Sequence, residues 1–311
     1  MIVRPLNRRP AFVCQPGLNK PFVGGKLNAM PRCFMPSQRS VRLLVGLGVS
    51  ACLVSVFQGD ARAQPGRGNG DTEARSALLP RVESLGDAPS DAIVIFNGKT
   101  TDMLVGPDGA PCRWPVEDGA LLCDTTRQAR QPGLWTKLHF KNAQIHAEVF
   151  VPVTDRRGQD AGNSGLYFHG LFEMQILDSY ESRVNPIYGM GAIYNINPPL
   201  VNAARPAGNW QTYDIIYRAP KRDEAGEPIA AGSMTALLNG ILVQDHFPVL
   251  RHVSVYAPLY AQRTPYSRSI RDSVLKTGAG PLQIQDHDSP VRFRNLWIRP
   301  LDAHSFVFSP E

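Results

Sequence analysis

The sequence of 311 residues predicts an all-β domain, an antiparallel sandwich or jelly roll, on three observations. Short runs rich in Val, Ile, Phe and Tyr recur between residues 91 and 301, separated by turn residues. Asn97-Gly98, Asp118-Gly119 and Asn239-Gly240 are dipeptides that favour tight hairpin turns. No helical pattern of ten or more residues follows the N-terminal region. Many short strands joined by hairpins are typical of sandwiches and jelly rolls.

The expected strands follow one another along this part of the chain. In order, they are residues 92–97, 120–124, 143–151, 165–170, 172–177, 212–218, 234–240, 241–245, 281–285 and 291–301. The segment 257–277 interrupts this rhythm, because it is too long and too polar for a hairpin loop. Long loops in compact domains are often functional. We therefore expect this segment at the rim of a binding face.

Residues 1–63 are expected to form a leader with an export signal. They hold nine Lys and Arg but a single acidic residue. The apolar run 41–57 is followed by Ala61-Arg62-Ala63, a small-x-small cleavage pattern. The mature protein would then begin near Gln64 and be periplasmic or secreted.

Cys52 supports a second interpretation of the leader. Val49-Ser50-Ala51-Cys52 is similar to a lipoprotein box, which would make the protein a lipoprotein anchored at Cys52. This interpretation ranks second, because the chain stays apolar beyond the cysteine. A membrane contact is expected only through the export signal or such an anchor.

The charge of the chain is divided unevenly, and this excludes nucleic acid as a partner. The whole sequence has a net charge of +6 and a pI near 9.2. Outside the leader, however, 24 basic residues face 26 acidic ones. The basic pI therefore belongs to the leader. Residues 64–90 are expected to be a flexible linker, 91–302 the folded domain and 303–311 a tail.

An alternating stretch, residues 162–180, predicts a strand pair with one apolar and one polar face. Side chains at i and i+2 share a face of a strand. The apolar face would hold Leu166, Phe168, Phe172, Met174 and Ile176. With a loop over residues 170–172, the other face would hold Tyr167, His169, Glu173 and Gln175. Solvated faces are usually rich in Lys, Thr and Ser, so this composition favours a binding face.

A second strand near residues 281–285 repeats this design. Leu282 and Ile284 would point one way, and Gln283, Gln285 and His287 the other. If both strands belong to one sheet, the two polar faces form a single surface. An imidazole titrates near pH 6.5, against about 4.3 for a glutamate. His287 is therefore the first candidate for a general base.

Glu173 could act as a base only if burial raised its pKa. Asp178 could share in the catalysis or be a turn cap. Tyr167, Tyr194 and Trp210 could stack on a sugar ring. His169, Glu173, Asp178 and His287 are suitable metal ligands, so a divalent metal stays open, although no compact metal motif occurs.

Other chemistries lack a sequence pattern. The glycine-rich nucleotide loops and the GxSxG nucleophile elbow are missing. No organic cofactor is expected. After cleavage two cysteines would remain, Cys112 and Cys123, and these could form a disulfide or stay as two buried thiols.

The ordered series of motifs resembles one family, the 3-keto-disaccharide hydrolase domain, also described as a 3-keto-glucoside 1,2-lyase and 3-keto-2-hydroxyglucal hydratase. The likeness covers about residues 91–301. It rests on IFNGK, WPVEDGAL, NSGLYFHG, FEMQILD, GAIY, AGNWQTYDI, LNG, LQIQDH and VRFRNLWIRPL.

The resemblance implies a concanavalin/laminin-G-like jelly roll that acts on glycosides oxidised at C3. It implies proton abstraction at C2, elimination at C1 and addition of water. Carried over by position, Glu173, Gln175 and Asp178 match E-x-Q-x-x-D. Gln285 and His287 match the motif of the last polar strand, and Asn163 matches N-S-G. The chain departs from the family at His169, where an arginine is usual, and at Asp288, where a glycine is common.

Three function classes fit the sequence. The first is an exported enzyme that cleaves or hydrates 3-keto-glycosides. The alternative is a non-catalytic carbohydrate-binding module that uses the same concave face. A cell-envelope interaction protein is the third. A residue able to act as a base separates the first class from the others, because binding alone needs none.

Export is predicted to leave a mature N-terminus near Gln64. N-terminal sequencing of the secreted protein checks this. A lipid-modified start at Cys52 would support the lipoprotein instead, and an intact leader would contradict both forms.

Overall fold

The structure is a computed structural model that describes residues 82, 87–123, 131–251 and 264–308. These residues belong to one compact unit, 67–311. The leader, Cys52 and most of the expected linker lie outside the described residues. None of the described helices is long and apolar enough to cross a membrane.

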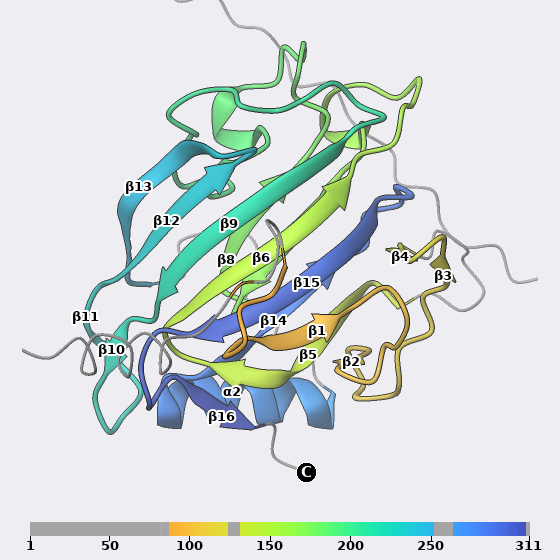
Figure 1. Cartoon of the computed structure of the whole chain (residues 1–311). Helices are drawn as coiled ribbons and strands as arrows, with labels where there is room; N and C mark the ends of the chain where they lie inside the picture. The colour runs from red at the N-terminus through yellow and green to blue at the C-terminus, as the bar shows by residue number, and fades with distance from the viewer. Residues whose placement is uncertain (1–81, 83–86, 124–130, 252–263, 309–311) are drawn as a thin grey trace, which may run out of the picture. The chain divides into compact units, whose positions relative to one another are not determined.

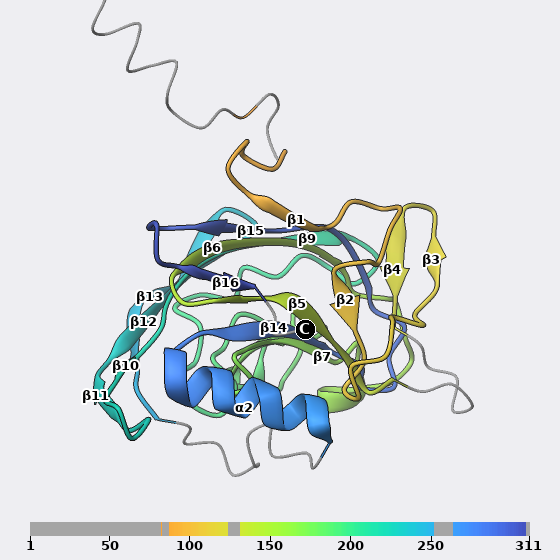
Figure 2. The same ribbon diagram turned by 90° about the horizontal axis from the view of Figure 1, so that it is seen from below.

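Two antiparallel sheets pack face to face, which confirms the predicted jelly-roll sandwich (Figures 1 and 2). The larger sheet has the strand order β13-β12-β9-β6-β15-β4-β3, and β1 also pairs with β15. Its strands are β1 (Ile93–Phe96), β3 (Val116–Glu117), β4 (Ala120–Leu122), β6 (Ala143–Phe150), β9 (Trp210–Arg218), β12 (Gly232–Leu238), β13 (Ile241–Val249) and β15 (Arg292–Pro300).

The smaller sheet has the order β16-β5-β14-β7-β8, and β2 also pairs with β5. Its strands are β2 (Leu104–Val105), β5 (Gly133–Phe140), β7 (Ser164–Phe168), β8 (Phe172–Ile176), β14 (Gly280–Gln285) and β16 (Phe306–Phe308). A separate hairpin pairs β10 (Lys221–Arg222) with β11 (Pro228–Ala230). Two short 3-10 turns are η1 (Gly158–Asp160) and η2 (Pro186–Tyr188).

The inner faces of the two sheets form one apolar core. Alternate residues of β9 point inward and are buried with those of β7, β8 and β14, namely Tyr213, Ile215, Tyr217, Leu166, Phe168, Met174, Leu282 and Ile284. The Tyr213 hydroxyl donates to the carbonyl of Gln175 on the facing sheet, at 2.6 Å. This bond links the core to the strand that carries the polar face.

Two of the expected hairpin turns are confirmed. Asp118 and Gly119 have φ of 50° and 73°, and Asn239 and Gly240 have 53° and 79°. Positive φ at both central residues is the mark of the hairpin turn that these dipeptides favour. The first turn joins β3 to β4 and the second joins β12 to β13.

A helix corrects the interpretation of the segment 257–277 as a long loop. Residues 257–263 lie outside the described residues, but α2 (Pro265–Thr277) is helical. The Thr264 hydroxyl caps it by accepting from the amide of Ser267, and Gly278 ends it with φ of 71°. The helix lies beside β14, on the side of the smaller sheet away from the larger one (Figure 2).

Other parts of the chain also differ from expectation, among them β2, β10 and β11, which were not expected as strands. β5 was not among the expected strands, yet it pairs with β14, β16 and β2. Residues 306–308, expected in the tail, form β16 on the edge of the smaller sheet.

Of the two alternatives for Cys112 and Cys123, the structure has free thiols and no disulfide between them. The hairpin register pairs Val116 with Leu121, so continued pairing places Trp114 opposite Cys123. Cys112 lies two residues beyond that position. Burial raises the pKa of the Cys123 thiol well above its usual value.

Candidate active site

The polar groups of three adjacent strands meet on the outer face of the smaller sheet. β7 pairs with both β8 and β14, and the register places Tyr167 opposite Glu173 on one side and opposite Gln283 on the other. Gln175 and Gln285 follow on the same face by alternation. The expectation that both polar strands belong to one sheet is thus confirmed. We call Tyr167, Glu173, Gln283 and Gln285 the carboxylate cluster.

Glu173 has the properties of a group that exchanges a proton near neutral pH. The Tyr167 hydroxyl donates to its Oε2 at 2.7 Å, and Gln285 Nε2 donates to the same hydroxyl at 3.2 Å. Burial raises the pKa of Glu173 to about 7, although the bond from Tyr167 lowers it. Both the ionised and the neutral form of this carboxyl group are therefore accessible near neutral pH.

The segment Asn163-Ser164-Gly165 builds the floor and one side of the cluster. Asn163 Nδ2 donates to the carbonyl of Gln159 at 2.7 Å, which holds the preceding loop. The Ser164 hydroxyl donates to the carbonyl of Gln285 at 2.7 Å and fixes the end of β14. A Cβ at Gly165 would collide with the Glu173 side chain, so glycine leaves the room in which that carboxylate lies.

Two tyrosines, Tyr188 and Tyr194, lie beside β8. Gln175 Nε2 lies 3.4 Å from Gln159 Oε1 and from the carbonyl of Tyr188, so Gln175 links β8 to the segment that carries Tyr188. The amide of Tyr194 donates to the carbonyl of Glu173 at 2.9 Å. The rings of Tyr188 and Tyr194 are 5.3 Å apart, centre to centre. Aromatic rings next to amide and carboxyl groups are the surroundings that a sugar requires.

Asp178 and His287 lie beyond the ends of two strands that share an edge. Because β7 is antiparallel to both β8 and β14, these two strands run in the same direction and end together. Asp178 lines an open groove of about 730 Å³ past this edge. Arg156 lines the same groove and donates to the carbonyl of Asp288 at 2.7 Å.

His287 differs from its expected position on the strand. β14 ends at Gln285, and His287 is exposed in the turn that follows. Asp288, which stands where the family has a glycine, has φ of 58°. The role of His287 as a general base stays a prediction.

His169 does not lie on the polar face, which corrects the expected register. The loop of the hairpin is residues 169–171, one position earlier than expected, so His169 is in the turn. Its ring packs against Phe140 and Tyr217 at centroid distances of 5.1 and 4.9 Å. Burial lowers the pKa of His169 to about 3, so the ring is neutral at physiological pH.

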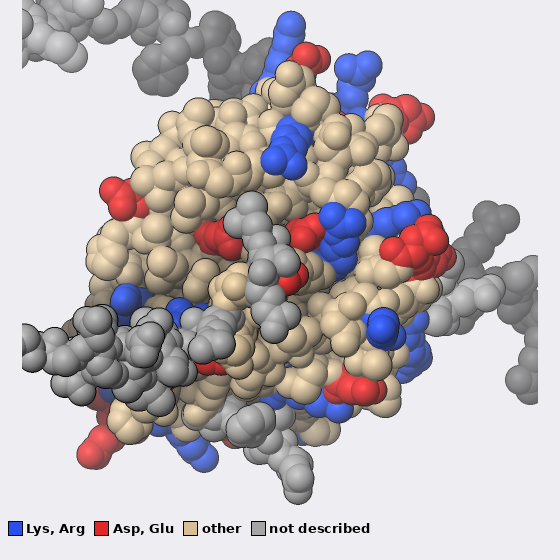
Figure 3. Space-filling model, viewed as in Figure 1, with Lys and Arg blue, Asp and Glu red and all other residues tan. Residues whose placement is uncertain are grey.

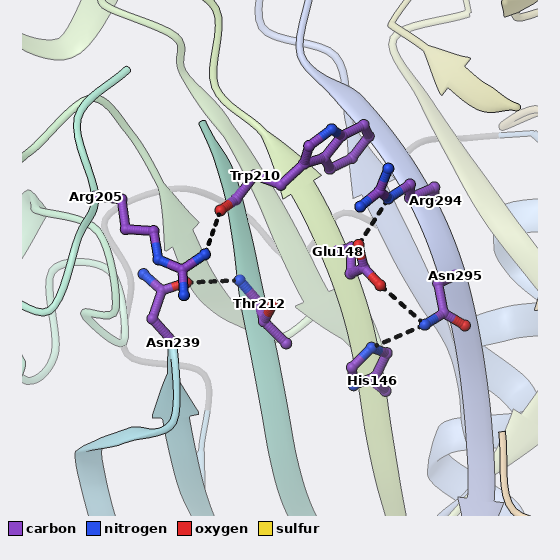
Figure 4. A network of polar contacts seen from close by, with 8 residues as sticks. All are labelled: His146, Glu148, Arg205, Trp210, Thr212, Asn239, Arg294 and Asn295. Carbon is purple, nitrogen blue, oxygen red and sulfur yellow. Dashed lines mark hydrogen bonds and ion pairs between the residues drawn. The ribbon is translucent and has the colours of Figure 1, made fainter. Parts of the chain in front are cut away.

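Trp210 lies on the opposite side of the sandwich from the carboxylate cluster. It projects from the outer face of the larger sheet, where the Arg294 guanidinium lies 4.0 Å from its ring centre (Figure 4). Arg294 also donates to Glu148, and Asn295 bridges Glu148 and His146. Stacking of Trp210 on a sugar held at Glu173 is therefore excluded by the fold.

The described residues contain no group of three His, Cys, Asp or Glu side chains that could hold a metal ion. The four potential ligands named from the sequence are thus not brought together. Sequence reasoning also missed two polar residues near the cluster. Gln159 lies in the 3-10 turn η1, which has no strand alternation, and Asp286 is a buried carboxyl group directly after β14.

A carboxyl group with a raised pKa, amides and aromatic rings on one outer face of an antiparallel β-sandwich form an arrangement typical of carbohydrate-binding proteins. The particular family follows from the sequence. Residues 91–299 match the model of the 3-keto-α-glucoside-1,2-lyase-like domain, and the chain belongs to this family. It is therefore a carbohydrate-active enzyme. A search of the curated proteins found no match.

One solved structure shares the fold, and two others show weaker similarity. A candidate glycosyl hydrolase from Parabacteroides distasonis ATCC 8503 is 34% identical, with a TM-score of 0.60, and the match covers 72% of this chain and 90% of that one. A second one from the same organism is 19% identical, with a TM-score of 0.44 and coverage of 68% and 94%. An alginate lyase in complex with an alginate trisaccharide is 11% identical, with a TM-score of 0.33 and coverage of 61% and 87%. Nothing about function follows from the last two.

Replacing Glu173 by Gln is predicted to stabilise the protein at high pH. The pKa of Glu173 rises from 4.5 to about 7 on folding, so the native state holds this proton more tightly. The wild type therefore loses stability as pH rises from about 4.5 through 7, by up to roughly 3 kcal/mol. Glu173→Gln keeps the apolar contacts and an acceptor for Tyr167 but has no charge to bury. Urea unfolding between about pH 4 and pH 8 measures the difference.

Glu148→Gln is the matched control for this experiment. Burial raises the pKa of Glu148, but hydrogen bonds from Asn295 and Arg294 outweigh it and hold that pKa below its ordinary value. This variant should lose stability at neutral pH instead of gaining it. Equal pH dependence of Glu173→Gln and wild type would contradict the buried carboxylate.

Proposed function

We propose that the protein is an exported enzyme that cleaves or hydrates 3-keto-glycosides, with Glu173 as the general base. The observation that carries this proposal is the buried carboxyl group of Glu173, which has a pKa of about 7 and is hydrogen-bonded to Tyr167. A base works best when its pKa lies near the working pH. Membership in the 3-keto-α-glucoside-1,2-lyase-like family supports this substrate class.

The first step is removal of a proton from carbon. A ketone at C3 acidifies the neighbouring C2–H bond, because the electron pair left behind is delocalised onto the ketone oxygen. The Glu173 carboxylate takes this proton and becomes a neutral acid. Proton transfer therefore needs the ionised form of Glu173, so the rate should rise with pH through about 7.

The second step is loss of the group at C1. The electrons of the enolate form the C1–C2 double bond, and the bond from C1 to the aglycone oxygen breaks. The leaving oxygen takes up a proton and departs as an alcohol. Addition of water across the double bond, with OH at C1 and H at C2, then yields the free 3-keto sugar.

The other polar groups of the cluster are suited to hold the sugar and its developing charge. Gln285 Nε2 donates to the Tyr167 hydroxyl at 3.2 Å and holds it beside Glu173. The Oε1 atoms of Gln283 and Gln285 are themselves buried and have no donor among the described residues. The Tyr167 hydroxyl can donate to an oxyanion once Glu173 has become protonated. Tyr188 and Tyr194 provide flat apolar surface for the ring.

Asp178 and His287 are proposed to act at the edge of the site. Asp178 lines the groove beyond β8, and His287 belongs to the turn that Arg156 ties to the same groove. A group in this position could protonate the leaving alcohol or activate the incoming water. In this proposal Glu173 removes the C2 proton, and His287 acts on the leaving alcohol or the incoming water instead.

Turnover of a 3-keto-glucoside, followed by NMR of its products, tests the proposal. Glu173→Gln should reduce kcat by about 10²- to 10⁴-fold, the usual effect of losing a general base, while substrate binding is retained. The wild-type kcat/KM should rise with pH and level off above about pH 7. Glu148→Gln, on the opposite face of the sandwich, should keep full activity.

His287→Gln separates the two candidates for the base. If this variant lost all turnover while Glu173→Gln kept the wild-type rate, His287 would be the base and our assignment would be wrong. If the protein bound ordinary glucosides but never turned over 3-keto-glucosides, the carbohydrate-binding module would be the better description.

A further inference from the structure

A recess lined by basic side chains lies at one end of the sandwich, apart from the carboxylate cluster. It has a volume of about 610 Å³ and contains none of the cluster residues. It is surrounded by the turn after β5, the end of β9, the β10–β11 hairpin and the end of α2. Its positively charged residues are Lys141, Arg218, Lys221, Arg222 and Lys276, with His246 beside them. No Asp or Glu side chain of the described residues lines it.

The five cations lack neutralising partners within the described part of the chain. None of them takes part in an ion pair there. Arg222 donates to the carbonyl of Gly226 at 2.8 Å, which fixes its side chain without cancelling its charge.

The nearby carboxylates are directed to other groups. Glu227 of the hairpin pairs with Arg251 at 2.9 Å, and Asp223 accepts from the amide of Glu227. Asp302 accepts from Asn142 Nδ2 at 3.0 Å and from the amide of His304 at 2.9 Å. Of these three carboxylates only Glu227 is in an ion pair among the described residues, and none of the three lines the recess.

The carboxyl end of α2 does not account for so much positive charge. A helix terminus carries roughly half an elementary charge, which is negative at this end. Lys276 in the last turn of α2 already compensates for it. The other four cations remain, and they repel one another unless an anion lies between them.

Positive charge is not spread in this way over the rest of the visible surface. On the face drawn in Figure 3, scattered Lys and Arg side chains are interspersed with Asp and Glu among uncharged residues. Outside the predicted leader, acidic residues slightly outnumber basic ones. The concentration of cations is therefore a local feature of the recess.

We propose that this recess is a second binding site, which takes the carboxylate, sulfate or phosphate group of an anionic saccharide. Its volume is in the range of small-molecule sites, and Pro220 and Ile229 provide apolar surface for a sugar ring. Arg and Lys are the side chains that bind such groups. The choice of a saccharide as carrier depends on the carbohydrate-active family, but not on the chemistry at Glu173.

Calorimetric titration of the full chain with tri-galacturonate, a trimer with three carboxylates, tests the site. Binding should weaken as salt is added, because exposed charges are screened. Lys221→Gln combined with Lys276→Gln should raise Kd about tenfold or more, since hydrogen bonds between charged groups are among the strongest. Both lysines are exposed, so folding should be unchanged.

Controls separate this site from a general charge effect and from catalysis. Lys99→Gln combined with Lys137→Gln removes the same charge at exposed positions outside the recess and should leave Kd unchanged. Glu173→Gln should bind tri-galacturonate as the wild type does, even if the proposed reaction at Glu173 is wrong.

Several results would overturn the proposal. If the Lys221→Gln, Lys276→Gln variant bound tri-galacturonate as well as the Lys99→Gln, Lys137→Gln control, the recess would not be the binding site. If neutral galactotriose or inorganic phosphate alone bound as tightly, the recess would not recognise an anionic saccharide. Binding to phosphatidylglycerol vesicles without binding to tri-galacturonate would make the partner a lipid surface.

Discussion

The alternation of side chains along β7, β8 and β14 is the constraint on which the site depends. Each of these strands places an apolar residue against the larger sheet and a polar one on the outer face, in strict succession. The apolar half cannot be exposed without a large loss of buried area. The position of Glu173 is therefore determined by the packing of Met174 behind it.

This support allows the protein to keep a carboxyl group in an unfavourable place. Burial works against ionisation of Glu173, while the Tyr167 hydroxyl favours it, and burial has the larger effect. The resulting shift corresponds to roughly 3 kcal/mol of interaction that the folded structure must supply. Gly165 leaves space for the side chain, and Ser164 fixes the adjacent strand end. The site is thus strained electrostatically and held by rigid neighbours.

The sequence predicted the features that alternation encodes and missed those that depend on register or tertiary contacts. The polar faces around Glu173 and Gln285 followed from period two alone. A one-residue change in the loop moved His169 into the core, which no local pattern reveals. Trp210 belongs to the larger sheet, on the far side of the sandwich from Glu173. Only the strand order shows this, and no local pattern gives the strand order. Thr264 as N-cap and Gly278 as C-cap are sequence signals for α2, but the polar composition of the segment favoured a loop.

The most direct test of this account is a titration of the Glu173 carboxyl group itself. Infrared difference spectra of wild type and Glu173→Gln, recorded from acid to neutral pH, isolate the carboxylate band of this residue. The account predicts a titration midpoint near pH 7 in the folded protein. Unfolding exposes Glu173 to water, so the midpoint should then fall to the ordinary value of 4.5. A midpoint near 4.5 in the folded protein would contradict the buried carboxyl group and, with it, the proposed base.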